Sequence, residues 1–255
     1  MAIAFAVVNQ KGGVGKTTTT VNLASYLATF GKKILLVDID AQSNASAGLG
    51  VDRSNLNLCL YNVMIEGVHP GEAIIKSNIA NLDVLPSTPR LAGAEVELVG
   101  MDPRETRLKE ALAMVKDNYD YLVIDCPPSL SLLTVNALTA ADEVIIPIQC
   151  EYYALEGISQ LTHTLELVRE NLNPALKIRG IVLTMFDPRT LLSSQVADET
   201  RKYFGNKVFK TVIPRNVRLA EAPSFGQPIL FYDPGSKGAE AYENLCREVL
   251  DDNRI

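Results

Sequence analysis

The sequence predicts a single-domain α/β protein with a mostly parallel, twisted sheet covered by helices on both faces. Apolar, β-branched runs alternate with helix-like stretches along the 255 residues, the pattern of strands buried on both faces. The composition is 47% hydrophobic and 21% charged, which suits a globular chain with one large core. Because no repeat, linker or compositional break interrupts the pattern, we expect residues 1–255 to form one domain. The first apolar run begins at residue 3, so we expect no N-terminal helix-turn-helix domain.

Seven apolar runs are the candidate strands, and six stretches between or after them have helical character. The strands are expected at Ile3–Val8, Lys33–Asp38, Leu82–Pro86, Tyr121–Asp125, Glu143–Ile148, Ile178–Thr184 and Val208–Ile213. The helices are expected at Thr17–Phe30, Arg104–Lys116, Ser131–Ala140, Ala154–Asn171, Ser193–Phe204 and Gly238–Leu250. In the last helix, apolar residues recur every three or four positions, as in a helix docked on a sheet.

A glycine-rich run, Gln10-Lys-Gly-Gly-Val-Gly-Lys-Thr-Thr18, separates the first strand from the first helix. Strand, glycine-rich turn and helix form the context of a phosphate-binding loop. The glycines let backbone N–H groups turn toward phosphate oxygens, and the helix N-terminus adds positive charge. Lys16 would reach the β- and γ-phosphates, and the Thr17 hydroxyl would hold Mg²⁺. The expected phosphate contacts come from Lys11, Gly12, Gly13, Val14, Gly15, Lys16, Thr17 and Thr18.

Acidic residues follow two of the candidate strands. The run Tyr121-Leu-Val-Ile-Asp125 ends in a carboxylate, and strand ends in open α/β sheets converge on the ligand crevice. Asp125 is therefore placed to hold Mg²⁺, through water. The second strand ends at Asp38-Ile-Asp40, where either acid could orient an attacking water or both could be solvated loop residues.

The loop departs from the common pattern G-x-x-x-x-G-K-[ST], because Gln10 stands where the first glycine would fall and Lys11 adds a second lysine. This deviant form, together with LLVDIDAQ, YDYLVIDCPPSL and TVIPRNVRLAEAPS, resembles the ParA/MinD family of ATPases over nearly the whole chain. Within it, the sequence is most similar to the Soj-like, short ParA proteins of chromosome partition. The resemblance implies a P-loop NTPase fold, bound ATP and Mg²⁺, and weak ATP hydrolysis that a partner stimulates.

The resemblance also implies residue roles around the phosphates. It gives the water-orienting role to Asp40, while Asp38 would brace the loop or the Mg²⁺ shell. Lys11 would cross a two-fold interface to the partner's ATP, so that a homodimer sandwiches two nucleotides. Gly12 would lie where the two chains approach most closely, and a side chain there should block dimerisation.

The segment after residue 176 is implied to hold the adenine and DNA contacts. Pro214 and Asn216 match part of the family's adenine pocket, in a stretch that the residues alone would assign to a loop. Arg189 and Arg218 match arginines that bind the DNA backbone. The net charge of −6 argues against DNA binding by the whole surface, yet residues 177–218 carry nine Lys or Arg against three acids. We interpret this as one basic face for nonspecific double-stranded DNA, read through phosphates.

The implied partner is a ParB-type centromere-binding protein, and the implied location is cytoplasmic and nucleoid-associated. A ParA-like ATPase that positions another cargo is an alternative with the same chemistry. A MinD-like membrane regulator would need a basic amphipathic C-terminus, whereas this chain carries Asp251 and Asp252 there, so we expect no membrane contact. An iron–sulfur reductase would need clustered cysteines, but the four cysteines form no C-x-x-C pair, so we expect reduced thiols.

Overall fold

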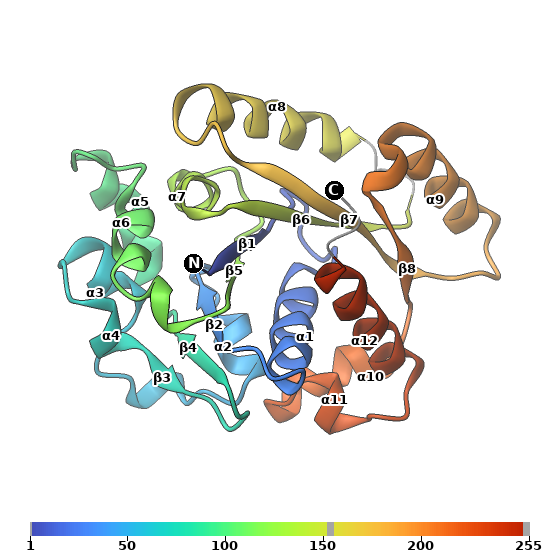
Figure 1. The fold of residues 1–255 in the computed structure, drawn as a ribbon, viewed down its shortest axis with the longest axis horizontal. Coiled ribbons are helices and arrows are strands. Elements are labelled where there is room, and N and C mark those ends of the chain that lie inside the picture. The colour runs from blue at the N-terminus through green and yellow to red at the C-terminus, as the bar shows by residue number, and fades with distance from the viewer. Residues whose placement is uncertain (1, 152–155, 252–255) are drawn as a thin grey trace.

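The computed structural model describes residues 2–151 and 156–251, and in this part of the chain it shows one eight-stranded sheet (Figure 1). The strands are β1 (Ile3–Val7), β2 (Ile34–Asp38), β3 (Ile75–Lys76), β4 (Leu82–Leu85), β5 (Tyr121–Asp125), β6 (Glu143–Gln149), β7 (Lys177–Phe186) and β8 (Val208–Pro214). Their order is β3-β4-β2-β5-β1-β6-β7-β8. Every pairing is parallel except that of β3 with β4.

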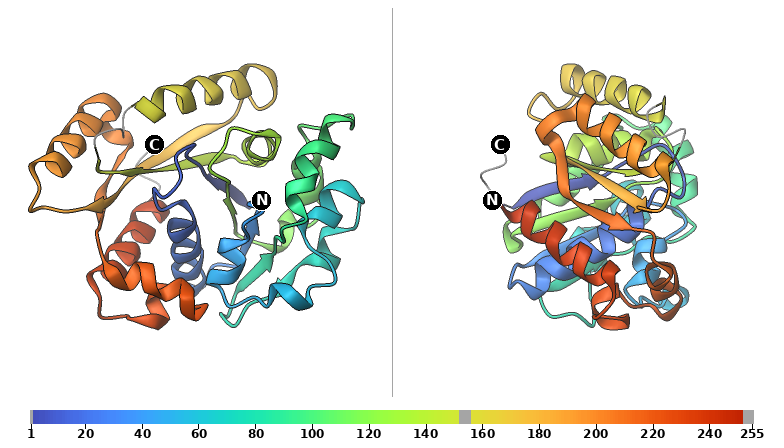
Figure 2. Two further views of the ribbon diagram at one scale, coloured as in Figure 1. Left: turned by 180° about the vertical axis from the view of Figure 1, so that it is seen from behind. Right: turned by 90° about the vertical axis from the view of Figure 1, so that its right-hand side faces the viewer.

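Helices cover both faces of the sheet, as the views from behind and from the right-hand side show (Figure 2). The helices are α1 (Lys16–Thr29), α2 (Asn44–Gly48), α3 (Leu60–Ile65), α4 (Pro70–Ala73), α5 (Leu91–Val99), α6 (Arg107–Ala113), α7 (Leu132–Ala140), α8 (Glu156–Asn171), α9 (Leu191–Phe204), α10 (Val217–Glu221), α11 (Ile229–Tyr232) and α12 (Lys237–Leu250). Helices α1 and α12 pack on one face, and α3, α5, α6, α7, α8 and α9 pack on the other.

Strand β1 shows why the strand sequences read as continuous apolar runs. Ala4 and Ala6 belong to the core on one face of the sheet, whereas Phe5 and Val7 belong to the core on the other. All four are at most 1% exposed. Because each face is covered by helices, every position must be apolar rather than every second one. The single-domain α/β fold with a mostly parallel sheet is thus confirmed.

The predicted strands and helices all form, with ends that differ by a few residues, while the short elements were missed. The predicted helix Arg104–Lys116 is shorter than expected, at Arg107–Ala113. The stretch after β8 was expected to be a loop, but part of it forms α10, whose N-cap residue Asn216 accepts a hydrogen bond from the Arg218 backbone N–H at 2.8 Å. Residues 154–155 of one predicted helix and residues 252–255 of the C-terminus lie outside the described residues.

The four cysteines agree with the expectation of reduced thiols. Cys59, Cys126, Cys150 and Cys246 are all buried and free. Within residues 2–151 and 156–251, none of the helices has both the length and the apolar character required to cross a bilayer.

Candidate nucleotide site

The glycine-rich loop lies at the carboxyl edge of the sheet and is held there by side chains of its neighbours. The Thr184 hydroxyl at the end of β7 donates to the Val14 carbonyl at 2.8 Å. Asn9 donates to the Pro147 carbonyl of β6 at 2.7 Å and accepts from the Lys11 backbone N–H at 3.0 Å. The loop is therefore tied to two strands that are remote from it in sequence.

Two glycines of the loop adopt backbone angles that other residues avoid. Gly13 has φ of 73° and Gly15 has φ of 88°, both in the left-handed region. Gly15 is the N-cap of the 14-residue helix α1 and makes no side-chain cap. The first backbone N–H groups of α1 thus meet no capping side chain, and such a helix start suits a phosphate group.

Lys16 is the first residue of α1, and it is only 7% exposed. Its Nζ donates to the Lys11 carbonyl at 2.9 Å, and this hydrogen bond holds the ammonium group against the glycine-rich loop. Burial lowers the pKa of this amine, and the negative charge of Asp125 partly opposes the shift. A buried cation inside a loop of N–H donors is the arrangement that binds phosphate oxygens.

Asp125 ends β5 directly opposite the N-terminus of α1. Its two carboxylate oxygens accept hydrogen bonds from the Thr17 and Thr20 hydroxyls, each at 2.8 Å. The residue is fully buried, and this burial, together with the charge of Asp38, raises its pKa to about 8. Asp38 is its register partner on the neighbouring strand β2.

Asp38 and Asp40 have different surroundings although they are two residues apart. Asp38 is buried and accepts from the backbone N–H and the hydroxyl of Ser46, at 2.8 and 2.7 Å, and burial raises its pKa to about 6. It therefore fixes α2 to the end of β2, rather than the phosphate loop that it was expected to brace. Asp40 is 8% exposed and accepts from the Gln42 backbone N–H at 2.9 Å.

The donor set at Thr17 and Asp125 fits Mg²⁺ bound together with a nucleotide. Within the described residues, no group of three or more His, Cys, Asp or Glu side chains forms a metal cage. Mg²⁺ commonly takes one or two protein oxygens and completes its shell with phosphates and water. Asp38 and Asp125 are adjacent buried carboxyl groups with raised pKa values, and a divalent cation bound beside them would reduce the repulsion between their negative charges. Thr17 and Asp125 would hold the ion, which would neutralise phosphate charge.

A cavity of about 410 Å³ opens beside the loop and supplies a place for a base. Gly15 and Thr18 line it together with Pro214 and Asn216, so the structure brings the two predicted adenine contacts to a cavity that the phosphate loop also lines. Sequence reasoning missed Met185, Thr184 and Tyr242, which also line it. Met185 has φ of 51°, an unusual value for a residue with a side chain. No local sequence pattern predicts this conformation.

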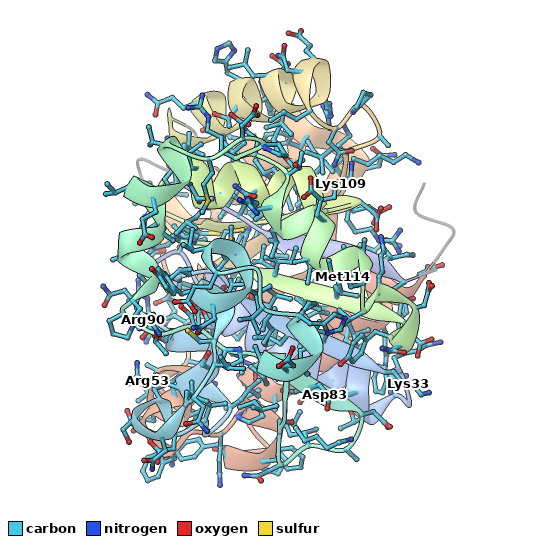
Figure 3. The ribbon with its side chains drawn as sticks, turned by 90° about the vertical axis from the view of Figure 1, so that its left-hand side faces the viewer. Lys33, Arg53, Asp83, Arg90, Lys109 and Met114 are labelled. Carbon is cyan, nitrogen blue, oxygen red and sulfur yellow. The ribbon has the colours of Figure 1, made fainter. Side chains whose placement is uncertain are left out.

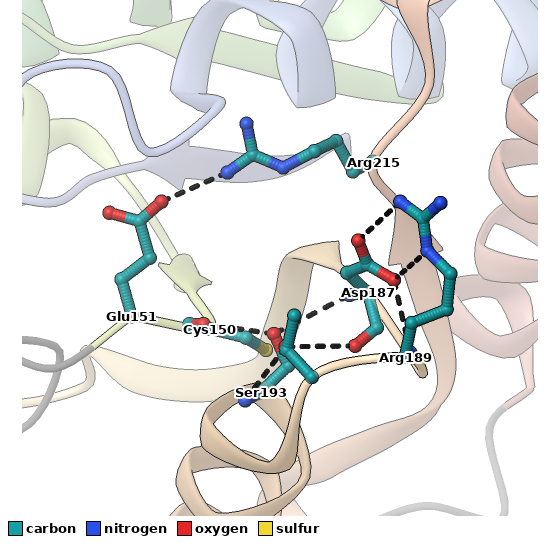
Figure 4. A network of polar contacts seen from close by, with 7 residues as sticks. Cys150, Glu151, Asp187, Arg189, Ser193 and Arg215 are labelled. Carbon is teal, nitrogen blue, oxygen red and sulfur yellow. Dashed lines mark hydrogen bonds and ion pairs between the residues drawn. The ribbon is translucent and has the colours of Figure 1, made fainter.

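Lys11 lies at the edge of a second surface hollow of about 520 Å³. Figure 4 shows a polar network in which Arg215 pairs with Glu151 at 2.9 Å and Arg189 pairs with Asp187. Of these residues, Glu151, Asp187 and Arg215 line the hollow. Arg215 also lines the base cavity. Lys11 thus lines the same hollow as two acids, Glu151 and Asp187, which follow β6 and β7.

The structure places both predicted DNA-contacting arginines on the surface, each paired with nearby acids. The Arg189 side chain is 86% exposed and binds Asp187 through Nε and Nη2, at 2.9 and 2.7 Å, an interaction that lowers the pKa of Asp187 to about 2. Arg218 binds Glu221 at 2.9 Å and Asp233 at 3.3 Å. Both arginines follow the carboxyl ends of their strands, on the nucleotide side of the sheet.

Comparison with known proteins agrees with this geometry. The sequence model of a family described as "AAA domain" matches residues 2–178. Sporulation initiation inhibitor protein Soj of Bacillus subtilis (strain 168) is 58% identical over 245 residues, covering 96% of this chain and 97% of that protein. Chromosome partitioning protein ParA of Caulobacter vibrioides (strain NA1000 / CB15N) is 51% identical over 252 residues, covering 98% and 94%. The chain belongs to the Soj/ParA family.

Solved structures of related proteins share the Soj/ParA fold. The cell division ATPase MinD of Pyrococcus furiosus superposes with a TM-score of 0.78 at 30% identity, covering 98% of each chain. Cobyrinic acid a,c-diamide synthase of Mycobacterium smegmatis, with bound ADP and magnesium, gives 0.85 at 37% identity, covering 97% and 93%. The predicted resemblance to the ParA/MinD family is confirmed, and the chain is a Soj/ParA-type P-loop ATPase of the chromosome-partitioning group.

Proposed function

We propose that this protein binds ATP with Mg²⁺, dimerises around two nucleotides, and in that state binds double-stranded DNA without sequence preference. Slow hydrolysis, accelerated by a ParB-type partner, would return it to a monomer and release the DNA. The observation that carries the proposal is the constellation of Lys16, Thr17, Asp125 and Asp40 around the glycine loop, with the base cavity adjoining it.

The position of Lys11 supports the dimer. Lys16 already supplies the cation within its own loop, so a second lysine at the rim serves a different phosphate group. Gly12 beside it is exposed, and the nearest atom to a Cβ built there is Pro128 Cβ at 4.0 Å. The chain itself therefore leaves room at residue 12, which a second protomer could fill.

The exposed ion pairs of Arg189 and Arg218 support the DNA contact. Ion pairs in full contact with solvent add little to stability and are screened by salt. A DNA phosphate can therefore replace Asp187 or Glu221 as the partner of the guanidinium at small cost. Dimerisation would bring two such sets together, which explains why DNA binding should require ATP.

The proposal is tested by DNA binding with ATP, with ADP and without nucleotide, over a series of salt concentrations. Arg189→Ala is compared with Arg90→Ala, because Arg90 is also exposed and paired with an acid, Glu66, at 3.0 Å. Arg90 directly precedes α5 and is labelled in the view of the left-hand side (Figure 3), whereas Arg189 precedes α9, which Figure 1 shows on the right. We expect ATP-dependent binding that falls steeply with salt, weakens in Arg189→Ala and is unchanged in Arg90→Ala.

Two results would contradict parts of the proposal. DNA binding that is equal in all nucleotide states would separate DNA from the ATP site. Loss of DNA binding in every state, with ATP-dependent dimerisation intact, would keep the ATPase but would favour a cargo other than chromosomes.

A further inference from the structure

A charged hollow, distinct from the base cavity and from the hollow that Lys11 lines, lies at the opposite edge of the sheet from the nucleotide site, where β6 and β7 begin. Its volume is about 380 Å³. Four cationic side chains line it, those of Arg169, Lys177, Arg179 and Lys207, against one carboxylate, that of Glu143. This excess of positive charge occurs in a protein whose net charge is −6.

The basic segment 177–218 is thereby divided into two groups, and it does not form the single basic face expected from the sequence. Strand β7 runs from Lys177 to Phe186, and ten residues in a strand span roughly 30 Å. Arg189 follows the carboxyl end of this strand, whereas Lys177 and Arg179 lie at its start. Contacts to DNA through Arg189 and Arg218 therefore leave the cations at the far edge unexplained.

Backbone carbonyls orient the two arginines of the hollow, and Arg179 is in addition paired with the Glu143 carboxylate at 3.7 Å. The Arg179 side chain is 7% exposed, and its Nη2 donates to the carbonyls of Val249 and Asp251. Arg169 donates from Nε to the Leu176 carbonyl at 2.8 Å. Because carbonyl acceptors orient a guanidinium without cancelling its charge, both arginines are fixed, and Glu143 offsets only one of the four positive charges that line the hollow.

One buried donor of the hollow lacks a hydrogen bond. Within the described residues, Arg179 Nε has no acceptor, and the Glu143 carboxylate lies 3.7 Å from it. Because this atom is closed off from solvent, its electrostatic partner is the Glu143 carboxylate rather than a ligand in the hollow. The neighbouring acid Asp142 does not line the hollow, and its carboxylate accepts from Lys116 and from the Ala4 backbone N–H, each at 2.8 Å.

We propose that this hollow is a second anion site, which binds a phosphate group independently of the nucleotide loop. Arg169 and Arg179 form the fixed part of the site and supply its positive potential. The exposed Lys177 and Lys207 at the rim neutralise the remaining charge of the dianion. A carboxylate ligand would leave more of the positive charge uncompensated, so a phosphate is the better match.

The test is a titration with inorganic phosphate, followed by calorimetry, of protein saturated with Mg²⁺ and a non-hydrolysable ATP analogue that fills the phosphate loop. The Lys177→Gln/Lys207→Gln variant is compared with Arg201→Gln/Lys202→Gln, which removes the same charge from exposed positions of α9. We expect one phosphate to bind to the parent, about 10-fold or more weaker binding in the rim variant, and parent-like binding in the α9 variant. Absence of saturable phosphate binding in the parent, or an equal loss of phosphate affinity in both variants, would overturn the proposal.

A second arm identifies the source of the phosphate group. Duplex DNA is titrated with the rim variant over a salt series. A salt slope reduced by about one to two units would assign the site to DNA backbone phosphates, whereas unchanged DNA binding with lost phosphate binding would assign it to a free phosphate compound. The phosphate titration does not use DNA or dimerisation, so it stands even if the proposed partition function fails.

Discussion

Replacement of Gly12 by valine should abolish ATP-dependent dimerisation while leaving the folded protomer almost unchanged. A Cβ at residue 12 meets its nearest neighbour, Pro128 Cβ, at 4.0 Å, an ordinary contact distance, and the backbone of Gly12 lies outside the left-handed region. We therefore expect the free energy of unfolding to change by no more than about 0.5 kcal/mol, as for a surface substitution. For a chain of this size this corresponds to about 1–2 °C in Tm.

The matched control is Gly13→Val, one residue further along the same loop. A Cβ at Gly13 meets no atom within 4 Å, but φ is 73°, so a side chain there is opposed by the backbone and costs about 1–2 kcal/mol. Gly13→Val should thus lower Tm by about 2–8 °C, which is more than the limit of about 1–2 °C expected for Gly12→Val. This pair of variants separates backbone strain from contact with a second chain.

The assay is analytical ultracentrifugation with and without ATP, beside thermal unfolding and binding of a fluorescent ATP analogue. Gly12→Val should bind the analogue and sediment as a monomer with ATP. A Gly12→Val dimer formed at the parent's ATP and protein concentrations would refute the close approach of two chains at this residue. A Tm loss equal to that of Gly13→Val would show that residue 12 is constrained within the protomer instead.

The remaining predictions concern the charges of the site. Lys16→Ala should weaken ATP binding at least 10-fold, since charge-assisted hydrogen bonds contribute about 1.5–3 kcal/mol; parent-like affinity in equilibrium dialysis would contradict this. Asp40→Ala should bind ATP, persist as a dimer and release no phosphate, and turnover at the parent rate would remove the water-orienting role. Asp125→Asn should change the pH dependence of the nucleotide-free protein. Because the pKa of Asp125 is raised to about 8, folded protein keeps a proton that unfolded chain has released, so stability falls between about pH 4 and pH 8, by up to about 1.4 kcal/mol per pH unit. Urea unfolding at pH 5 and pH 8 should show a smaller loss in Asp125→Asn, and equal losses in the two proteins would argue against the shift.

The sequence was sufficient to predict the elements that are marked by a local motif or by a repeating pattern of apolar residues. Apolar runs and helical spacing predicted the seven parallel strands and six of the longer helices, because burial on both faces requires apolar residues at every strand position. The glycine-rich loop could be predicted because only glycine adopts the left-handed backbone angles found at residues 13 and 15 without conformational strain. The short helices α2, α10 and α11 were not readable, since a single helical turn is stabilised by tertiary packing rather than by its own sequence.

The candidate site shows the same division. Lys16, Thr17 and Asp125 could be assigned from motifs. The tertiary structure added the hydrogen bonds that join these segments: the Thr17 and Thr20 hydroxyls both donate to the Asp125 carboxylate, and the Thr184 hydroxyl donates to a carbonyl of the loop. These hydrogen bonds join residues more than a hundred positions apart, with no local pattern to mark them.

The chain by itself determined that a phosphate loop follows the first strand and that acids end two others, because both are consequences of local residue order. Only the tertiary structure decided how charge is distributed. The parallel sheet sends the start and the end of β7 to opposite edges, so basic residues that are neighbours in the sequence are separated into a group beside the nucleotide and a group at the far hollow. Sequence proximity says how many charges a segment carries, and the length of a strand decides which of them act together.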